Sequence, residues 1–190
     1  KQFLERKYGL IEKYTDYIKT HIDIDAGMFS TSDTDLDKYG EYVVSLLDAA
    51  DAIAYWRNYP SPMVFAPYYC NQVKHIDVNN IYPFPFWHNN EIPDWQSELT
   101  GKRVVVVTSF SDTVYRQYLK RQLLWNDPSI LPEFDLIPFK AVQTNGNNRD
   151  TTFNSWFQAY EYMLAELVHL EYDLALISCG SYGAPLAMDD

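Results

Sequence analysis

The 190-residue chain has a formal net charge of −11, and 47% of its residues are hydrophobic and 16% aromatic. This apolar content excludes a disordered chain and is sufficient for a sizeable core. The acidic balance argues against nucleic-acid binding, because such a surface repels phosphate backbones unless a basic patch overrides it. The densest basic cluster, Arg116, Lys120 and Arg121, is too small for that role.

The sequence contains no predicted membrane or secretory segment. No apolar run approaches the roughly 20 residues that span a bilayer, and residues 1–7 are charged and helical in pattern. Two cysteines, Cys70 and Cys179, are typical of a reducing compartment, so we expect a cytoplasmic protein. The chain lacks an initiator Met and stops inside a predicted helix, and we expect it to be a fragment of a longer protein.

The N-terminal half predicts two helices, a strand and an irregular stretch. Apolar residues at helical spacing predict a helix over 2–20 and a second helix capped by Ser32 or Thr34. Residues 52–56 predict a short strand. Prolines interrupt residues 57–100, where we expect a short helix near 63–75 followed by an aromatic loop. That loop could be core packing or a wall for a sugar or base.

The C-terminal half opens with the clearest strand, Val104 to Val107, followed by a polar turn over 108–112. A helix comes next, and either Ser109 or Ser111 is placed to cap it. The residues expected on the apolar side of this helix are Val114, Tyr118, Leu119 and Leu123. This is a strand-turn-helix unit, as in α/β folds.

Two more strands follow, separated by a polar loop over 143–150 and a helix over about 152–170. The first covers 134–142, where Pro138 favours a sheet edge or a bulge. The second, 174–178, begins with the continuous apolar run Leu174 to Ile177 and is predicted to be buried on both faces. With the strands at 52–56 and 104–108, this alternation predicts a mostly parallel α/β sheet.

We expect a single domain over residues 1–190. Its N-terminal helices (1–50) and an irregular, aromatic and proline-rich segment (57–100) precede the alternating half (101–190).

Three turns should meet at the carboxyl edge of this sheet, where open α/β sheets bind their ligands: 108–112, 143–150 and 178–183. The last turn carries Gly180 and Gly183 before a helix start, a geometry that favours anions. Glycine there could equally serve the backbone conformation alone. The polar side chains on offer suit a phosphorylated or polyhydroxylated ligand: Ser109, Ser111, Asp112, Gln143, Thr144, Arg149, Ser181 and Tyr182.

Other chemistries have weaker support. The four histidines show no zinc-ligand spacing. The sequence also lacks the Gly-x-Ser-x-Gly elbow of α/β-hydrolases, which makes that class of enzyme a weaker candidate. Cys179 ends a predicted buried strand and is better explained as a core thiol than as a nucleophile. Asp-x-Asp pairs can hold a cation against a diphosphate. Those within 33–37 are explained by a helix dipole, whereas Asp23 and Asp25 leave both interpretations open.

Several short motifs, in order, resemble one known family. They are Ala26-Gly-Met-Phe29, Gly101-Lys-Arg-Val-Val-Val-Val-Thr-Ser-Phe-Ser-Asp-Thr-Val114, Ile130-Leu-Pro-Glu-Phe134, Ala141-Val-Gln-Thr144 and Asp173-Leu-Ala-Leu-Ile-Ser-Cys-Gly-Ser-Tyr-Gly183. Over roughly residues 25–187 the chain resembles the GT-D-type glycosyltransferase fold domain, met in bacterial polysaccharide and glycoprotein glycosylation loci. The resemblance implies a Rossmann-like three-layer fold that binds a nucleotide-sugar donor and transfers the sugar to a glycan acceptor hydroxyl.

The resemblance also implies roles for the turns at 109–112 and 179–183, which become donor-site elements. The residues expected to bind the donor are Ser109, Ser111, Gln143, Thr144, Gly180, Ser181, Tyr182 and Gly183. Asp112 is the best local candidate for the base that activates the acceptor hydroxyl. The family's acidic, metal-associated Asp-Gly-Glu-like motif has no match here, so a requirement for Mn²⁺ or Mg²⁺ stays open. The alternative is a non-catalytic nucleotide- or carbohydrate-binding module.

Overall fold

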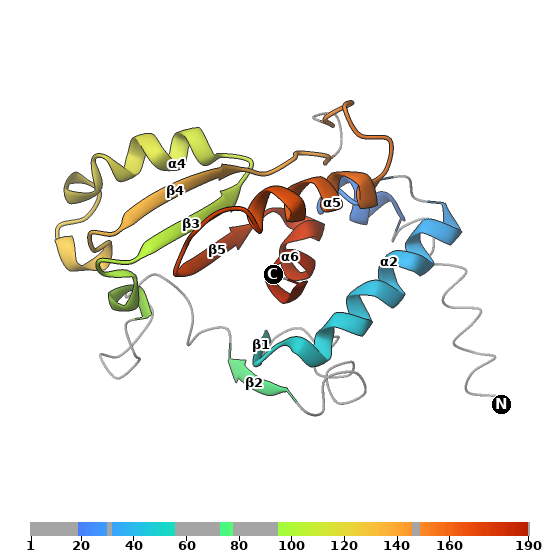
Figure 1. The fold of residues 1–190 in the computed structure, drawn as a ribbon, viewed down its shortest axis with the longest axis horizontal. Helices are drawn as coiled ribbons and strands as arrows, with labels where there is room; N and C mark the ends of the chain where they lie inside the picture. The colour runs from blue at the N-terminus through green and yellow to red at the C-terminus, as the bar shows by residue number, and fades with distance from the viewer. Residues whose placement is uncertain (1–18, 30–31, 56–72, 78–94, 146–148, 190) are drawn as a thin grey trace.

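The computed structural model describes residues 19–29, 32–55, 73–77, 95–145 and 149–189. These form a mixed α/β structure with two short parallel sheets, one of three strands and one of two (Figure 1). The predicted helix over 2–20 lies mostly outside the described residues, although residues 19–24 are helical. No helix among the described residues is long and apolar enough to cross a membrane.

The larger sheet has the order β4-β3-β5, with β3 (Arg103–Thr108) between β4 (Asp135–Lys140) and β5 (Leu174–Ser178). All three strands are parallel, so the predicted strands are confirmed. Pro138 sits in β4, an edge strand of this sheet, because proline cannot donate to a ladder. The expectation for β5 was wrong: its residues 174–177 are half-buried, since β5 is also an edge strand.

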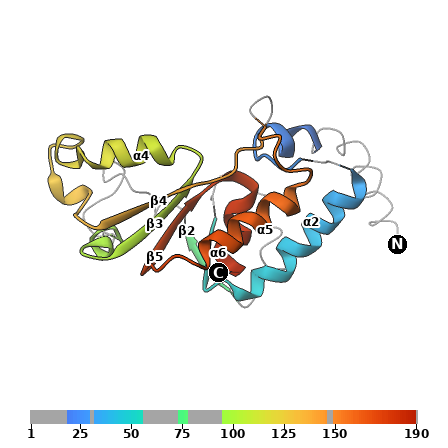
Figure 2. The same cartoon turned by 45° about the horizontal axis from the view of Figure 1, so that its top comes forward.

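Helices cover both faces of this sheet. On one face, α4 (Ser111–Tyr118) packs against β4 and β3 over a small core that includes Val104 and Tyr118. On the other, Val105 and Val107 join a larger core with α5 (Trp156–Leu167) and α6 (Gly183–Asp189). The chain leaves β3 for β4 and then crosses back to β5. Right-handed crossovers in opposite directions place their helices on opposite faces, as Figure 2 shows for α4 and α5.

The N-terminal helix α2 (Asp33–Leu46) joins the larger core from outside, beside α5 and α6 (Figures 1 and 2). Ser32 caps it, as one of the two predicted alternatives, by accepting a hydrogen bond from the Asp35 N–H. The hydroxyls of Tyr42 and Tyr160 donate to Asp189 Oδ2 at 2.6 and 2.8 Å. These bonds connect α2, α5 and α6, and burial together with the Asp189 carboxylate keeps both phenols protonated by raising the pKa of each.

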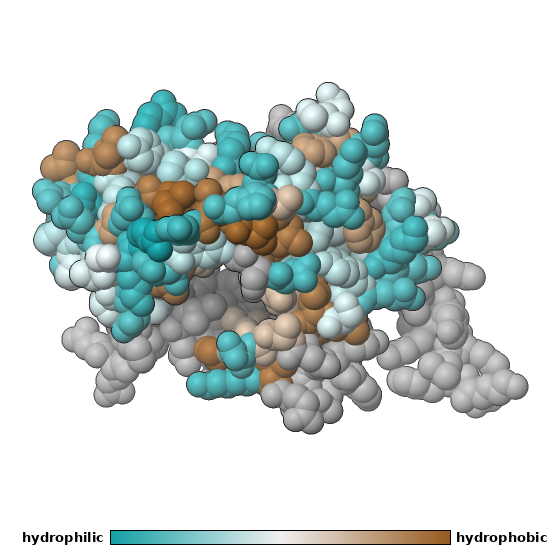
Figure 3. Space-filling model, in the orientation of Figure 1, coloured by the Kyte–Doolittle hydropathy of each residue, from teal (hydrophilic) through white to brown (hydrophobic). Residues whose placement is uncertain are grey.

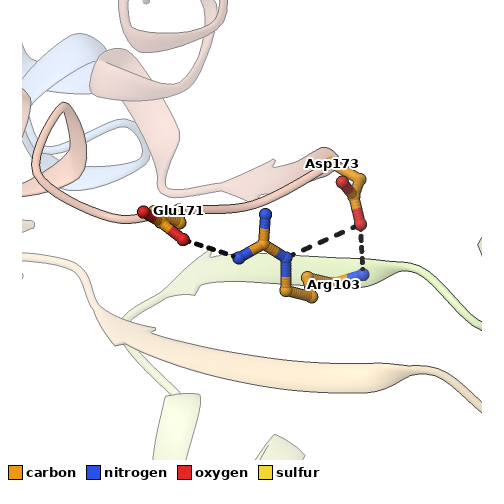
Figure 4. Close-up of polar contacts among 3 residues, drawn as sticks. All are labelled: Arg103, Glu171 and Asp173. Carbon is orange, nitrogen blue, oxygen red and sulfur yellow. Dashed lines mark hydrogen bonds and ion pairs between the residues drawn. The ribbon is translucent and has the colours of Figure 1, made fainter.

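The amino edge of the larger sheet is held by charged groups at the surface. The Arg103 N–H donates to Asp173 Oδ2 at 2.8 Å, and its guanidinium lies 3.0 Å from Glu171 Oε2 (Figure 4). The Asp173 N–H donates back to the Arg103 carbonyl at 2.8 Å. This exchange aligns β5 with β3 at the end opposite to the three predicted turns.

The second sheet corrects the predicted topology. The strand β1 (Ala52–Tyr55) exists, but it pairs with β2 (Lys74–Asp77) and not with the larger sheet. The predicted helix near 63–75 is wrong at residues 74–75, which belong to β2. Residues 63–72 of that prediction lie outside the described residues. The sequence of β2 carries one large apolar residue, Ile76, among polar ones, so it lacks the alternation by which strands are predicted.

The helices differ from prediction at their ends. Ser155 caps α5 by accepting from the Gln158 N–H, so the helix begins four residues later than expected. Neither Ser109 nor Ser111 caps α4, whose N-cap is Phe110 with no side-chain bond. Leu119 and Leu123 are exposed rather than packed. Short 3-10 helices lie at Leu47–Ala49, Trp95–Leu99, Arg121–Leu123, Pro128–Ile130 and Gly180–Tyr182.

Candidate functional site

A cavity of about 170 Å³ lies at the carboxyl edge of the three-stranded sheet. The turns that follow β3, β4 and β5 all contribute to it, so the predicted convergence of these turns occurs in the structure. A fourth contributor is the segment 25–27, which comes from the N-terminal part of the chain. The lining residues are Asp25, Ala26, Gly27, Ser109, Phe110, Val142, Gln143, Thr144, Asn145, Ser178, Cys179, Gly180 and Tyr182.

Five of the predicted binding residues line this cavity, and the others do not. Those that line it are Ser109, Gln143, Thr144, Gly180 and Tyr182. Ser111 is buried at the start of α4, and Ser181 is buried behind the cavity. Gly183 begins α6 away from the lining. The predicted convergence of the strand ends therefore located the cavity, whereas three of the eight predicted binding residues do not line it.

The turn after β5 is occupied by the chain itself. Gly180 has a φ of 64°, the left-handed region that favours glycine. The Ser181 N–H, predicted to face an anion, donates to the Ala26 carbonyl at 2.8 Å. A Cβ at Gly180 would lie 2.5 Å from the same carbonyl oxygen. A backbone carbonyl thus sits where the sequence predicted a phosphate oxygen.

Side chains of this turn are also engaged inside the protein. Trp156, completely buried, donates from Nε1 to Ser181 Oγ at 2.8 Å, and its ring stacks on Tyr160 and Tyr182 at 5.1 and 5.0 Å. Thr144 Oγ1 donates to the Gly27 carbonyl and lies 2.9 Å from the Tyr182 hydroxyl. These buried bonds hold the segment 26–27 against the sheet edge.

The turn after β3 is more open. Ser109 is half-buried and Phe110 is 64% exposed, and both line the cavity. The candidate base Asp112 points elsewhere: it lies outside the lining, its side chain is 82% exposed, and it is 3.6 Å from Lys140 Nζ. The structure therefore separates Asp112 from the polar groups it was expected to serve.

The carboxylate that lines the cavity is Asp25, which the sequence flagged only within an Asp-x-Asp pair. Its Oδ2 lies 2.8 Å from His21 Nδ1. The other member of the pair, Asp23, is bound by the Arg149 guanidinium, which also lies over the Phe29 ring. The two carboxylates thus have separate partners. Within the described ranges, no three His, Cys, Asp or Glu side chains are close enough to hold a metal ion.

A second, larger hollow of about 710 Å³ adjoins the first, and the two share Val142 and Gln143 in their linings. Two cations, Lys140 and Arg149, line it. So do two aromatic residues, Phe153 and Tyr162, whose ring centroids are 5.2 Å apart. Lys140 is paired with Asp112 and Arg149 with Asp23, and Asp150 also lines this hollow. The pair of hollows thus combines a small polar chamber with a wider space that has aromatic surface and ion-paired cations.

Cys179 lines the first cavity as a free thiol. Burial raises its pKa to about 12, because a thiolate loses its hydration there. The thiol is therefore protonated at neutral pH and a poor nucleophile. This agrees with the prediction of a structural thiol, while Cys70 lies outside the described residues.

No family model, curated protein or solved structure matched the chain in the three comparisons. The likeness to the GT-D-type family, noted from short motifs, remains a prediction, and function is argued below from the residues themselves.

Sequence reasoning missed Ala26, Gly27, Phe110 and Asn145 as parts of the cavity. The segment 26–27 is distant in sequence from the strand ends, and no local pattern predicts where it docks. A signal did exist for Phe110 and Asn145, since both lie in turns already predicted to converge. The prediction chose other side chains of the same turns, among them Ser109 and Gln143.

Proposed function

We propose that this protein binds a nucleotide-sugar at the carboxyl edge of its three-stranded sheet and transfers the sugar to an acceptor hydroxyl. The observation that carries the proposal is the strand order β4-β3-β5, in which the chain moves outward from β3 to β4 and then reverses to β5. Ligands of open α/β sheets bind at such a reversal, between the carboxyl ends of the diverging strands. The first cavity lies at this point, which also supports a Rossmann-like arrangement.

The two hollows divide the chemistry of such a donor. Their volumes, about 170 and 710 Å³, together fall within the range of small-molecule sites. In this proposal the diphosphate lies near Lys140 and Arg149 and competes with Asp112 and Asp23 for these two cations. The small chamber, with Ser109, Gln143 and Asn145, suits the hydroxyls of a sugar.

The base in this proposal is Asp25 rather than Asp112, because Asp25 lines the chamber and Asp112 does not. A base must come within hydrogen-bond reach of the proton it removes. The His21 ring at 2.8 Å from Asp25 Oδ2 orients the carboxylate. Among the residues that the structure describes, no three His, Cys, Asp or Glu side chains lie together as metal ligands, and the requirement for Mn²⁺ or Mg²⁺ is measured in the binding test below. A reducing, cytoplasmic compartment is part of the proposal and agrees with the free thiol of Cys179.

The second candidate is a module that binds a nucleotide or carbohydrate without catalysis. It is favoured by the isolation of Asp25, whose Asp-x-Asp partner Asp23 is engaged by Arg149. The variant Asp25→Asn separates the two functions, with Asp37→Asn on the exposed side of α2 as control. An enzyme would bind donor in both variants and lose turnover only in Asp25→Asn. A module would bind donor without turnover even in the unmodified protein.

The proposal is tested by thermal shift with nucleoside diphosphates and nucleotide-sugars, with and without Mn²⁺ or Mg²⁺. A ligand at about 100 times its dissociation constant adds roughly 2.7 kcal/mol of stability. We expect Gln143→Glu to weaken binding about tenfold or more, because its carboxylate would repel the diphosphate. Gln117→Glu, exposed on α4, introduces the same charge outside the hollows and should leave binding unchanged. If no nucleotide or nucleotide-sugar raises the midpoint, the proposal is wrong.

A further inference from the structure

The end of α4 exposes large apolar side chains that the sequence pattern assigned partly to the core. Tyr115 is 42% exposed, Leu119 64%, Leu123 84% and Leu124 38%. Together with Phe110 they make up half of the exposed large apolar residues in the described part of the chain. Single exposed apolar residues are ordinary, but a cluster of this kind marks a binding surface.

Tyr115 and Leu119 lie on one flank of α4, next to the side that packs on the sheet. The Leu119 N–H donates to the Tyr115 carbonyl at 3.1 Å, so these two residues lie one helical turn apart. Leu123 and Leu124 follow in the next, 3-10 turn. The side of α4 that carries Ser111 and Tyr118 is buried against the sheet. Figure 3 shows hydrophobic atoms surrounded by hydrophilic ones at this end of α4, on the upper left.

Positive charge accompanies this apolar surface. Arg116 and Lys120 flank Tyr115 and Leu119 in the sequence, and both side chains are exposed. Neither forms an ion pair with a carboxylate of any residue that the structure describes, whereas the neighbouring Arg121 is paired with Glu133. Arg116 donates only to the Asp112 carbonyl, at 3.2 Å. Two cations thus remain available in a chain whose net charge is −11.

We propose that this surface, formed by Tyr115, Leu119, Leu123 and Leu124 with Arg116 and Lys120, docks on an anionic lipid bilayer. Apolar side chains beside exposed Lys and Arg are the composition of helices that lie in a membrane interface. The long cationic side chains reach the headgroups while the leucines enter the acyl boundary. Lysine is depleted at protein–protein interfaces, so Lys120 beside the leucines fits a bilayer better than a protein partner.

The acidic remainder of the molecule defines the orientation. An anionic bilayer repels a chain of net charge −11 as a whole, whereas the exposed cations Arg116 and Lys120 attract it at this end of α4. The helix has eight residues, which is roughly 12 Å of axis. The cavity-lining Phe110 is the N-cap of α4, so the docking surface lies at the other end of the helix from the cavity. Docking itself does not depend on which ligand the cavity takes.

The test is flotation of the 190-residue protein with vesicles of phosphatidylcholine, with and without phosphatidylglycerol. We expect co-flotation with the anionic vesicles that weakens as salt is added. The double variant Leu119→Ser/Leu123→Ser should reduce it at least about tenfold, since two exposed leucines no longer enter the bilayer. Each charge reversal, Arg116→Glu or Lys120→Glu, should weaken binding about fivefold or more.

A matched control removes two exposed apolar residues elsewhere, Val168→Ser/Leu170→Ser after α5, and should leave flotation unchanged. Equal thermal midpoints for the two double variants exclude unfolding as the cause. Absence of co-flotation at low salt overturns the proposal. So does self-association that depends on protein concentration and disappears in Leu119→Ser/Leu123→Ser, because the surface would then join two copies of this chain.

Discussion

Two turns at the carboxyl edge of the same sheet have opposite roles. The turn after β5 carries glycines and looks in sequence like an anion site, yet its Ser181 N–H binds the Ala26 carbonyl. The turn after β3 has no glycine, and its Ser109 and Phe110 remain at the cavity surface. Glycine in a strand-to-helix turn therefore permits close approach, and the approaching group can be the protein's own backbone.

The largest expected effect is that of Gly180→Ala on the free energy of unfolding. The new Cβ would meet the Ala26 carbonyl at 2.5 Å, and the residue would be held at a φ of 64°. Left-handed backbone costs about 1–3 kcal/mol for an ordinary residue, and the clash adds about 1–3 kcal/mol. We therefore expect a loss of about 3 kcal/mol or more, measured by denaturant unfolding.

Alanine variants of two other glycines distinguish the cost of left-handed backbone from the cost of the steric clash. Gly101 has a φ of 70° with no atom within 4 Å of its Cβ position, so Gly101→Ala should cost only about 1 kcal/mol. Gly40 lies inside α2 with free space around it, so Gly40→Ala should stabilise by about 1 kcal/mol. A loss at Gly180 no greater than that at Gly101 would contradict the close contact with Ala26. Gly180 is also unsuitable for testing ligand binding, since its variants report on folding.

The two turns can be compared directly through their serines. Ser181→Ala leaves the buried Trp156 Nε1 without its acceptor, at a cost of about 1–3 kcal/mol. Ser109→Ala removes a hydroxyl from the cavity surface and should change stability by no more than about 0.5 kcal/mol. Chemical denaturation followed by tryptophan fluorescence measures both. Equal effects would show that the turns do not differ in structural role.

A smaller effect is expected from the bond between the Tyr182 hydroxyl and Thr144 Oγ1, 2.9 Å apart. Tyr182→Phe should cost about 1 kcal/mol, because one buried hydrogen bond is lost. Thr144→Val should cost more, since the Gly27 carbonyl then lacks its donor as well. In the double variant the losses should fall short of their sum by about 0.5–1 kcal/mol. Strict additivity in this cycle would mean that the two hydroxyls act independently.

The smallest effect concerns thiol chemistry in the variant Cys70→Ser, in which Cys179 is the remaining cysteine. Burial raises the pKa of Cys179 to about 12, so its thiolate is scarce at pH 8, at about one part in ten thousand. Modification by a disulfide reagent should be very slow at pH 8 and accelerate about tenfold per pH unit as the thiolate fraction grows. Rapid modification at pH 7 would show an activated thiol in the cavity.

The sequence alone identified the three strands of the main sheet from their apolar residues, but it did not predict their burial correctly, since β5 is half-buried at a sheet edge. It also brought the turns after these strands together, since the carboxyl ends of parallel strands share an edge. Strand prediction from the sequence failed at β2, whose residues are mostly polar. The prediction of buried side chains failed at Leu119 and Leu123, which have helical spacing but lie beyond the end of the short helix α4 and are exposed.

What only the tertiary structure decided is which polar groups are free. The strand order, the pairing of β1 with β2, and the docking of segment 26–27 depend on contacts between residues distant in the chain. Local periodicity suggests which side of an element faces the core, but it does not identify the distant group that packs there. For that reason the carboxylate at the candidate site is Asp25, more than 80 residues from the turn where the sequence placed it at Asp112.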